Sequence, residues 1–205
     1  MKFSPILFST PMVQAILSNQ KFQTRRTNGL DKLTNHYFQS MVHHYTGKFT
    51  FVENGNFNPE EKDVIEVKCP YGKVGDVLWV RETMIFNKNS QTYWPVSDGY
   101  KRSISPLTNK PVFEYEKVVS SIHMPKKACR LFLKITDIRV EQLNHISRGD
   151  AMLEGCHFAN MQTGPNPVDW FKDLWKSMNG EESWNSNPWV WVISFERIDK
   201  PENFS

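Results

Sequence analysis

The fold class that the sequence predicts is α+β, with short helices packed beside a sheet. Residues 10–17 begin with Thr10, which can cap a helix, and Pro11, which suits the first helical turn, and their apolar residues recur at helical spacing. Residues 167–178 show the same amphipathic spacing. Residues 130–140 instead alternate between apolar and polar side chains. The first two patterns predict helices, and the third predicts a long, half-buried strand.

Other elements follow from local signals along the chain. An irregularity is expected near Asp137 of the long strand, where the alternation slips. Further strands are expected at 77–80 and 189–197, which are rich in β-branched and aromatic residues. A capping-box pattern at 147–150 starts a short helix that Gly155 ends. The remaining expectations are a helix within 31–45 and, at 85–123, an insertion that forms a lid or a hairpin over a site.

The composition is that of a globular protein. Of its 205 residues, 39% are hydrophobic and 23% are charged, which leaves ample material for a core. No apolar run approaches the ~20 residues that span a bilayer, and the first residues lack the apolar segment of a signal peptide. We therefore expect a soluble protein of the cytoplasm that does not bind membranes.

Cysteine and histidine give no sign of a metal site. Cys69, Cys129 and Cys156 are widely spaced and form no CxxC pair, so free thiols are expected rather than disulfides or a zinc site. His43 and His44 are adjacent and point apart on a helix, and no nearby residue completes a chelating pattern with them and His36. No metal and no cofactor is predicted.

Charge is unevenly distributed along the chain. Residues 1–140 hold 20 basic and 12 acidic residues, whereas residues 141–205 hold 5 basic and 10 acidic residues. This asymmetry favours one face that attracts phosphates, and Lys126, Lys127 and Arg130 are its candidate nucleic-acid contacts. The alternative is an ordinary solvated surface without a ligand.

The stretch Lys21-Phe22-Gln23-Thr24-Arg25-Arg26 concentrates reactive groups. It brings an amine, a hydroxyl and two guanidinium groups into six residues just after the first predicted helix. In a regular strand Lys21 and Arg25 share one face and Thr24 lies on the other, so cooperation of Lys21 with Thr24 requires a bend. The alternative is a basic edge strand whose charges discourage association between sheets.

Two further places carry candidate site residues. Arg81 and Glu82 follow the strand at 77–80, where they line either a pocket mouth or a solvated rim, and Trp79 offers a stacking surface beside them. Glu154 falls in the last turn of its short helix, where the helix dipole disfavours a carboxylate. This local cost indicates that Glu154 has a partner or a task.

The order of these motifs resembles the ASCH domain of the PUA-like superfamily, in particular the longer ASCH-type proteins of phages and prophages. The motifs are the helix and basic strand at 15–26, Gly75 to Thr83, Asp150 to Gly155 and Asn187 to Ile193. The resemblance implies a single domain over 1–205, built as a mixed β-barrel with flanking short helices and elaborated at about 27–68 and 87–123. It also implies a cleft beside the first helix for a nucleobase or an RNA segment.

Small bacterial ASCH enzymes that look similar are N4-acetylcytidine amidohydrolases, which use a Lys, a Thr and a Glu. The matching positions are Lys21, Thr24 and Glu154, and Arg26 matches the Arg of the family motif. Phe22 departs from the usual Thr, and the chain is about twice as long as those enzymes. The resemblance implies a hydrolase in the cytoplasm of a bacterial host, with a nucleoside or RNA as its partner.

In such a reaction Thr24 would attack the amide, Lys21 would act as base, and Glu154 would protonate the leaving amine. Arg25 and Arg26, with Trp79, Arg81 and Glu82, are the candidate substrate-binding residues.

Three other functions remain open. The first is a non-catalytic protein that binds RNA or single-stranded DNA. Its contacts would be made by basic residues between 117 and 139 and by the aromatic residues Trp79, Tyr93 and Trp94. Its affinity for nucleic acid would fall steeply as the salt concentration rises. The second is a ribonuclease. The third is a phage accessory module, and under every reading Trp170, Trp175, Trp189 and Trp191 are expected in the core. The oligomeric state is not predicted.

Overall fold

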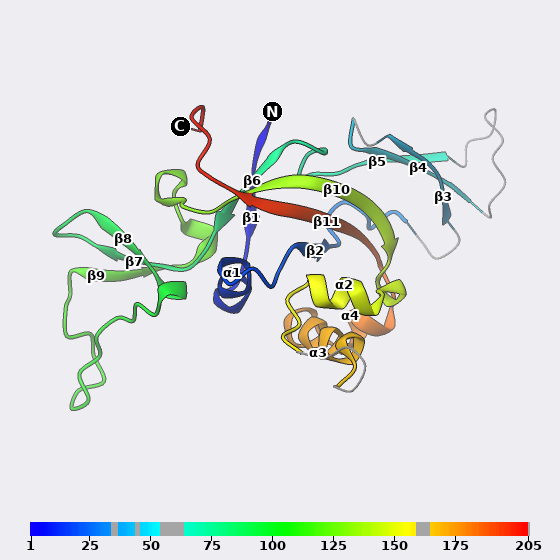
Figure 1. The fold of residues 1–205 in the computed structure, drawn as a ribbon. Coiled ribbons are helices and arrows are strands. Elements are labelled where there is room, and N and C mark those ends of the chain that lie inside the picture. The colour runs from blue at the N-terminus through cyan, green and yellow to red at the C-terminus, as the bar shows by residue number, and fades with distance from the viewer. Residues whose placement is uncertain (34–36, 44–45, 54–63, 159–164, 205) are drawn as a thin grey trace.

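An open, mixed five-stranded sheet lies at the centre of the computed structural model (Figure 1). Its strands run in the order β1 (Phe3–Leu7), β6 (Val77–Arg81), β10 (Phe132–Gln142), β11 (Trp189–Ile198) and β2 (Gln23–Arg26). The pair β1 and β6 is parallel, and the other neighbours are antiparallel. The short edge strand β2, which contains Thr24 and Arg25, therefore pairs with the long strand β11.

The structure describes residues 1–33, 37–43, 46–53, 64–158 and 165–204. His36 and His44 lie outside this part of the chain, and the side chain of His43 is not described either. Within the described ranges no three His, Cys, Asp or Glu side chains are grouped so that they could hold a metal ion. Among the same residues, no helix has the length and apolarity needed to traverse a membrane.

Two smaller sheets flank the central one. The first consists of β3 (Tyr37–His43), β4 (Lys48–Glu53) and β5 (Val64–Lys68), and the second runs in the order β8 (Thr92–Pro95), β7 (Met84–Asn87) and β9 (Glu116–Val119). The helix expected within 31–45 is wrong for residues 37–43, because this segment pairs with β4 as a strand. Tertiary pairing here overrides a weak local preference. The second sheet accords with the hairpin expected within 85–123.

The strand predictions hold in the central sheet. β10 has a register shift between Ile135 and Asp137, where the irregularity was predicted. The barrel does not appear: the strands of the described segments form three open sheets, and β1 and β2 remain unpaired edges of the central one. The coarser prediction of an α+β fold is confirmed.

The four α-helices of the described segments lie on the same side of the arch formed by β10 and β11 (Figure 1). They are α1 (Thr10–Leu17), α2 (Arg148–Leu153), α3 (Pro167–Asn179) and α4 (Glu181–Asn185). Short 3-10 turns complete the chain: η1 (Val96–Asp98), η2 (Ser121–His123), η3 (Lys126–Ala128) and η4 (Leu143–His145). The helices predicted at 10–17, 147–154 and 167–178 are thus present.

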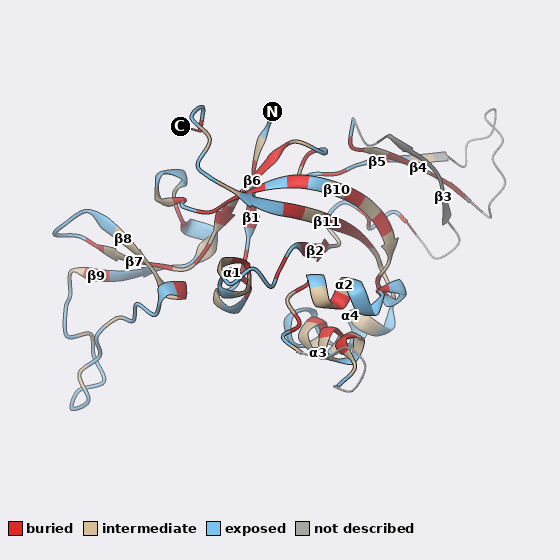
Figure 2. Cartoon of the chain, viewed as in Figure 1, coloured by how far each residue is buried: buried red, intermediate tan, exposed pale blue. Residues whose placement is uncertain are grey.

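Among the described residues the buried side chains form three clusters: one between α1 and the central sheet, one between α3 and that sheet, and one where β7 meets β6 and β10 (Figure 2). Trp191 and Trp175 are buried, and Trp189 and Trp170 pack against these clusters, as predicted. The three cysteines are free and buried, which confirms the expectation of free thiols. Burial raises the pKa of Cys69 and Cys129 to about 11, so these thiols stay protonated at neutral pH.

Candidate functional site

Backbone contacts bring the end of α2 against the segment that leads into β2. Lys21 and Glu154 form an isolated antiparallel bridge, and the Phe22 N–H donates to the Leu153 carbonyl at 2.8 Å. The Lys21 N–H donates to the Ala15 carbonyl of α1 at 3.1 Å. Residues more than 130 positions apart in the sequence are therefore joined through the main chain, before any side chain is considered.

Gly155 permits this close approach. Its φ of +108° lies in the region that side-chain-bearing residues rarely adopt. A Cβ atom built there would stand 3.3 Å from the Ala15 Cβ and 3.5 Å from the Lys21 Cβ. Glycine at this position thus lets α2 end directly against α1 and leaves Glu154 beside Lys21.

Two cations hold the Glu154 carboxylate. Lys21 Nζ donates to Oε2 at 2.6 Å and to the Glu154 backbone carbonyl at 2.8 Å, and Arg25 donates to Oε1 at 3.0 Å. Lys21 is 1% exposed, Arg25 2% and Glu154 4%. Glu154 therefore has two partners, Lys21 and Arg25, where the sequence predicted at least one. Each oxygen of its carboxylate accepts a hydrogen bond from one of them.

Arg25 extends this arrangement into a network of ion pairs. It donates to Glu141 Oε1 at 2.6 Å and lies 3.6 Å from Asp150 Oδ2, while Arg139 pairs with both of these carboxylates. The Arg25 guanidinium also stands 5.4 Å from the centre of the Phe171 ring. Three cations and three carboxylates balance one another, which is how a largely buried set of charges is tolerated.

Burial and pairing shift the pKa values of Lys21 and Asp150 in this network. Burial lowers the pKa of Lys21, partly opposed by the attraction of Glu154 and assisted by Arg26 and Arg25. Burial would raise the pKa of Asp150, but hydrogen bonds from Ser147 and Arg139 outweigh it and bring the pKa to about 2. Ser147 and Asp150 also form the capping box that starts α2, so the helix and the ion network share a residue.

Two cavities meet at Glu154. A small one of about 140 Å³ is lined by Thr24, Arg25 and Arg26 of β2 and by aromatic residues of α3. A larger one of about 740 Å³ lies between α1 and α3 and is lined by both polar and apolar side chains. Glu154 lines both of them, together with residues of α1 and α3: Met12, Leu174 and Met178.

Thr24 is the unusual member of the small cavity. Its side chain is 1% exposed, and its Oγ1 has no hydrogen-bond partner among the residues that the structure describes. A buried hydroxyl without a partner costs roughly 1–3 kcal/mol, so such a group calls for an explanation. A bound molecule that hydrogen-bonds to Thr24 would supply one.

The structure thus gathers several of the predicted residues. Lys21, Arg25 and Glu154 are in direct contact, and Thr24 and Arg26 line a cavity with Glu154. Lys21 reaches this group through Glu154 and does not itself line either of the two cavities. β2 is an edge strand, as the alternative reading holds, yet Lys21 and Arg25 are buried and cannot shield that edge from other sheets.

Trp79, Arg81 and Glu82 lie in a different place, and none of them lines the two cavities. Arg81 stacks on Trp79 and donates to the Ile122 carbonyl. Glu82 is buried and accepts hydrogen bonds from Ser97 and, at 3.0 Å, from Arg130. Their predicted role in substrate binding stays a prediction.

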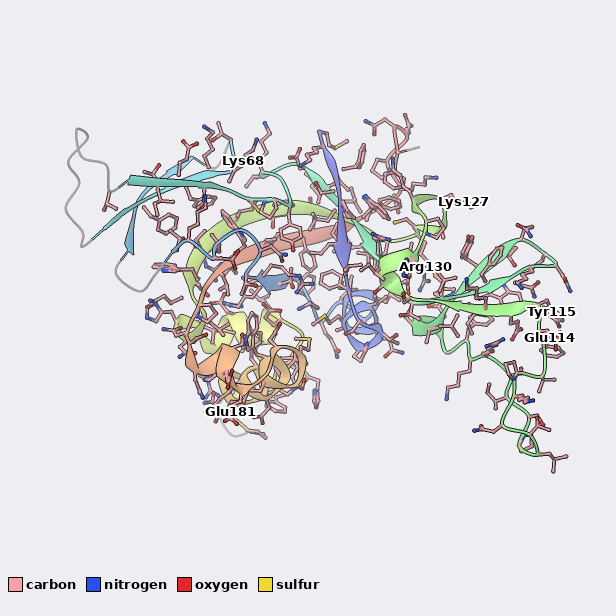
Figure 3. The ribbon with its side chains drawn as sticks, turned by 180° about the vertical axis from the view of Figure 1, so that it is seen from behind. Lys68, Glu114, Tyr115, Lys127, Arg130 and Glu181 are labelled. Carbon is pink, nitrogen blue, oxygen red and sulfur yellow. The ribbon has the colours of Figure 1, made fainter. Side chains whose placement is uncertain are left out.

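The three predicted nucleic-acid contacts cluster near the start of β10. Figure 3 labels Lys127 and Arg130 beside the β7–β9 sheet, well separated from Glu181 of α4. Arg130 is engaged by Glu82 and Asp98, whereas Lys127 lies 5.9 Å from the Tyr93 ring and Lys126 lies 4.5 Å from the Phe204 ring. Arg130 therefore has less charge to offer a phosphate than the two lysines.

Sequence reasoning missed the outer half of the network, which is Arg139, Glu141 and Asp150. A signal was present: Asp137, Arg139 and Glu141 occupy alternate positions of one strand and so share a face. The helix that carries Phe171 was predicted, but its packing over Arg25 depends on tertiary structure alone.

No protein-family model and no curated protein matches the chain. A solved structure, described as the high-resolution crystal structure of the ASCH domain from Lactobacillus crispatus JV V101, is similar to it, with a TM-score of 0.43 and 12% sequence identity. The match covers 97% of this chain and 81% of that one. It bears the name of the domain that the sequence motifs resemble.

Proposed function

We propose that the chain binds the base of a modified cytidine in the cavities beside Glu154 and hydrolyses its N4-acyl amide. The observation that carries this proposal is the position of the Glu154 carboxylate, which is held by Lys21 and Arg25 and lines the same cavity as the unpaired hydroxyl of Thr24. An acid and an alcohol thereby border one cavity, and the amine of Lys21 contacts the acid from outside that cavity.

The lining of the small cavity suits a flat, polar heterocycle. Arg26 and Asn28 offer hydrogen-bonding groups, and Phe171 and Trp175 offer aromatic surfaces. The larger cavity has a volume within the range of about 300–1,000 Å³ that is usual for small-molecule sites. Together they provide room for a nucleoside with its acyl group.

The reaction needs one internal proton transfer before it starts. Passing a proton from the Lys21 ammonium to Glu154 gives a neutral amine and a neutral acid without changing the total charge of the pair. Burial favours this neutral form, because it lowers the pKa of Lys21. Arg25 opposes it by donating a hydrogen bond to the carboxylate.

From the neutral pair, Lys21 accepts the proton of Thr24 as its oxygen bonds to the acyl carbon. The bond between that carbon and N4 then breaks, and Glu154 donates a proton to the departing amine of cytidine. Water hydrolyses the resulting ester, which releases the carboxylic acid and restores the Thr24 hydroxyl. Arg26 lines this cavity and would stabilise the developing oxyanion.

The test is hydrolysis of N4-acetylcytidine by Thr24→Val and Thr24→Ser. Valine keeps the shape of threonine without its hydroxyl, so we expect kcat/KM to fall by about 10³-fold or more, whereas serine should restore part of it. Ser4→Ala is a matched control, because Ser4, on the opposite edge strand β1, also has a buried hydroxyl that lacks a partner among the residues described. Equal rates for Thr24→Val and the wild type would exclude Thr24 as the nucleophile.

One observation favours the non-catalytic alternative. The contact of 2.6 Å between Lys21 and Glu154 stabilises the ammonium form of lysine, which cannot accept a proton. A protein that binds cytidine by calorimetry, but hydrolyses neither N4-acetylcytidine nor labelled RNA, would be a base reader rather than a hydrolase or a ribonuclease.

A further inference from the structure

A further cavity is lined by lysines. It has a volume of about 410 Å³, and its wall contains Lys2, Lys68 and Lys73 together with the carboxylate of Asp76. We call these four residues the lysine pocket. None of them lines the cavities beside Glu154, and Figure 3 labels Lys68 on the opposite side of the arch of β10 and β11 from α3. The lysine pocket is therefore separate from the candidate site.

Asp76 fixes the two chain segments that carry Lys2 and Lys73. It is 4% exposed, and its two carboxylate oxygens accept hydrogen bonds from the backbone N–H of Lys2 at 2.7 Å and of Lys73 at 3.1 Å. The Val77 N–H donates in turn to the Lys2 carbonyl at 2.9 Å. Because backbone amides engage both oxygens, this carboxylate holds the wall of the pocket in place.

A tight turn brings Lys68 and Lys73 to the same cavity. The Gly72 N–H donates to the Cys69 carbonyl at 3.3 Å, and the φ of Gly72 is +129°, a value that side-chain-bearing residues rarely adopt. A Cβ atom built on Gly72 would stand 2.8 Å from Asp76 Oδ2. Glycine here thus lets the turn close over the carboxylate, with Lys68 just before the turn and Lys73 within it.

The pocket lysines are exposed and lack acidic partners. Lys48, which stands opposite Lys68 in the register of β4 and β5, pairs with Glu66 at 2.7 Å. Within the described part of the chain, no such ion pair joins a carboxylate to any of the three pocket lysines. Burial raises the pKa of Cys69 in the same wall, and the charge of Lys2 opposes this rise, which places that ammonium near the thiol.

We propose that the lysine pocket binds the phosphate group of a small phosphorylated molecule. Three ammonium groups and one carboxylate leave a formal charge of +2, which matches the two negative charges of a phosphomonoester above its second pKa of about 6. Lysine binds phosphate as a point charge, and a phosphomonoester has three terminal oxygens to offer. The cavity volume lies within the range of about 300–1,000 Å³ that is usual for small-molecule sites, so an organic part also fits.

The experiment titrates the full chain with ribose 5-phosphate by calorimetry at about pH 8, where the phosphate is a dianion, in a buffer free of phosphate and sulfate. Ribose 5-phosphate has no base and no amide, so the result is independent of whether the chain hydrolyses acylcytidine. We expect saturable binding at one site. Lys68→Gln and Lys73→Gln should each weaken it by about 5-fold, and their combination by about 25-fold.

Lys48→Gln is the matched control. It removes the same charge from the neighbouring strand, but Lys48 does not line the pocket and already pairs with Glu66. Its affinity for ribose 5-phosphate should stay within about 2-fold of the wild type, because salt screens a charge outside the pocket. Circular dichroism checks that all three single variants and the double variant keep the fold.

Several results would overturn the proposal. Absence of saturable binding of both ribose 5-phosphate and inorganic phosphate at about 1 mM would do so, as would equal losses in the pocket variants and in Lys48→Gln. Inorganic phosphate bound as tightly as ribose 5-phosphate would show that the pocket holds an ion only. Succinate bound as tightly would show that it recognises charge alone. Displacement of ribose 5-phosphate by an oligouridine that lacks a terminal phosphate would show that the lysines bind the singly charged phosphodiesters of RNA instead.

Discussion

Two buried glutamates lie on opposite sides of α1 and have different surroundings. Glu154 is 4% exposed and Glu82 is 1% exposed, and each is paired with an arginine. The Glu82 group reaches α1 through Ser97, whose carbonyl accepts a hydrogen bond from Gln14 at 3.0 Å. Burial and an arginine partner therefore do not distinguish the two carboxylates.

The difference lies in what adjoins each carboxylate. The oxygens of Glu82 are satisfied by Ser97 and Arg130, and these contacts connect β6, η1 and the start of β10. Glu154 instead lines two cavities, and the small one is also lined by Thr24, whose hydroxyl has no hydrogen-bond partner among the described residues. A buried carboxylate beside free space and an unsatisfied group is available for chemistry, whereas the Glu82 carboxylate, whose two oxygens are both engaged, joins structural elements.

Exchange of each glutamate for glutamine should separate the two roles most strongly. Glu154→Gln removes the proton donor of the proposed reaction, so we expect kcat/KM on N4-acetylcytidine to fall by about 10²–10⁴-fold. The comparison predicts a much smaller change for Glu82→Gln. The measurement is initial rates for both variants, with binding of cytidine measured in parallel.

Glu116→Gln serves as the control for this pair. Glu116 is a buried carboxylate of β9 that is 8% exposed and lies outside both glutamate groups. Equal activity losses in the Glu82 and Glu154 variants would break the comparison and support the sequence prediction that Glu82 contacts substrate.

Replacing Arg25 should lower the stability of the fold more than replacing Arg130. The Arg25 side chain is fully buried and pairs with three carboxylates, so Arg25→Met should lower the free energy of unfolding by about 3–5 kcal/mol. The Arg130 side chain is 35% exposed, and Ser97 still serves Glu82 without it, so Arg130→Met should cost only about 1–2 kcal/mol.

Urea unfolding followed by circular dichroism measures both values. A cost for Arg130→Met equal to that for Arg25→Met would mean that the Glu82 group is as tightly coupled to folding as the Glu154 network. The difference in exposure between Arg25 and Arg130 would then not be reflected in the free energy of unfolding.

Local patterns predicted most of the central sheet and the helices. The alternation of 130–140, with its slip at Asp137, and the capping box before Glu154 are periodic or short-range signals, which a single sequence carries. The strand at 37–43 was missed because its conformation depends on pairing with β4, a neighbour in space that local propensity does not report.

The candidate site likewise contains a part that the sequence predicted and a part that it did not. The unfavourable position of Glu154 at the end of α2 predicted a partner, and alternation placed Lys21 and Arg25 on one face, where both contact Glu154. Glu141 of β10 and Asp150 of α2 complete the network because their side chains reach Arg25 of β2, a long-range result of tertiary structure. The cavities likewise arise from the spacing of α1 and α3.

The smallest expected effect is the acid dependence that Asp150 gives to the Glu154 network. Its pKa of about 2 in the folded chain lies below its ordinary value of 3.8, so its stabilising effect is complete above about pH 5 and is lost as the pH falls toward 2. A difference of this size corresponds to about 2 kcal/mol. Between pH 6 and pH 2 the free energy of unfolding of the wild type should therefore fall by about 2 kcal/mol more than that of Asp150→Asn, which cannot titrate. Urea titrations at a series of pH values give both curves, and parallel curves would show that the ion pairs around Arg25 add no acid-sensitive stability to this side of α1.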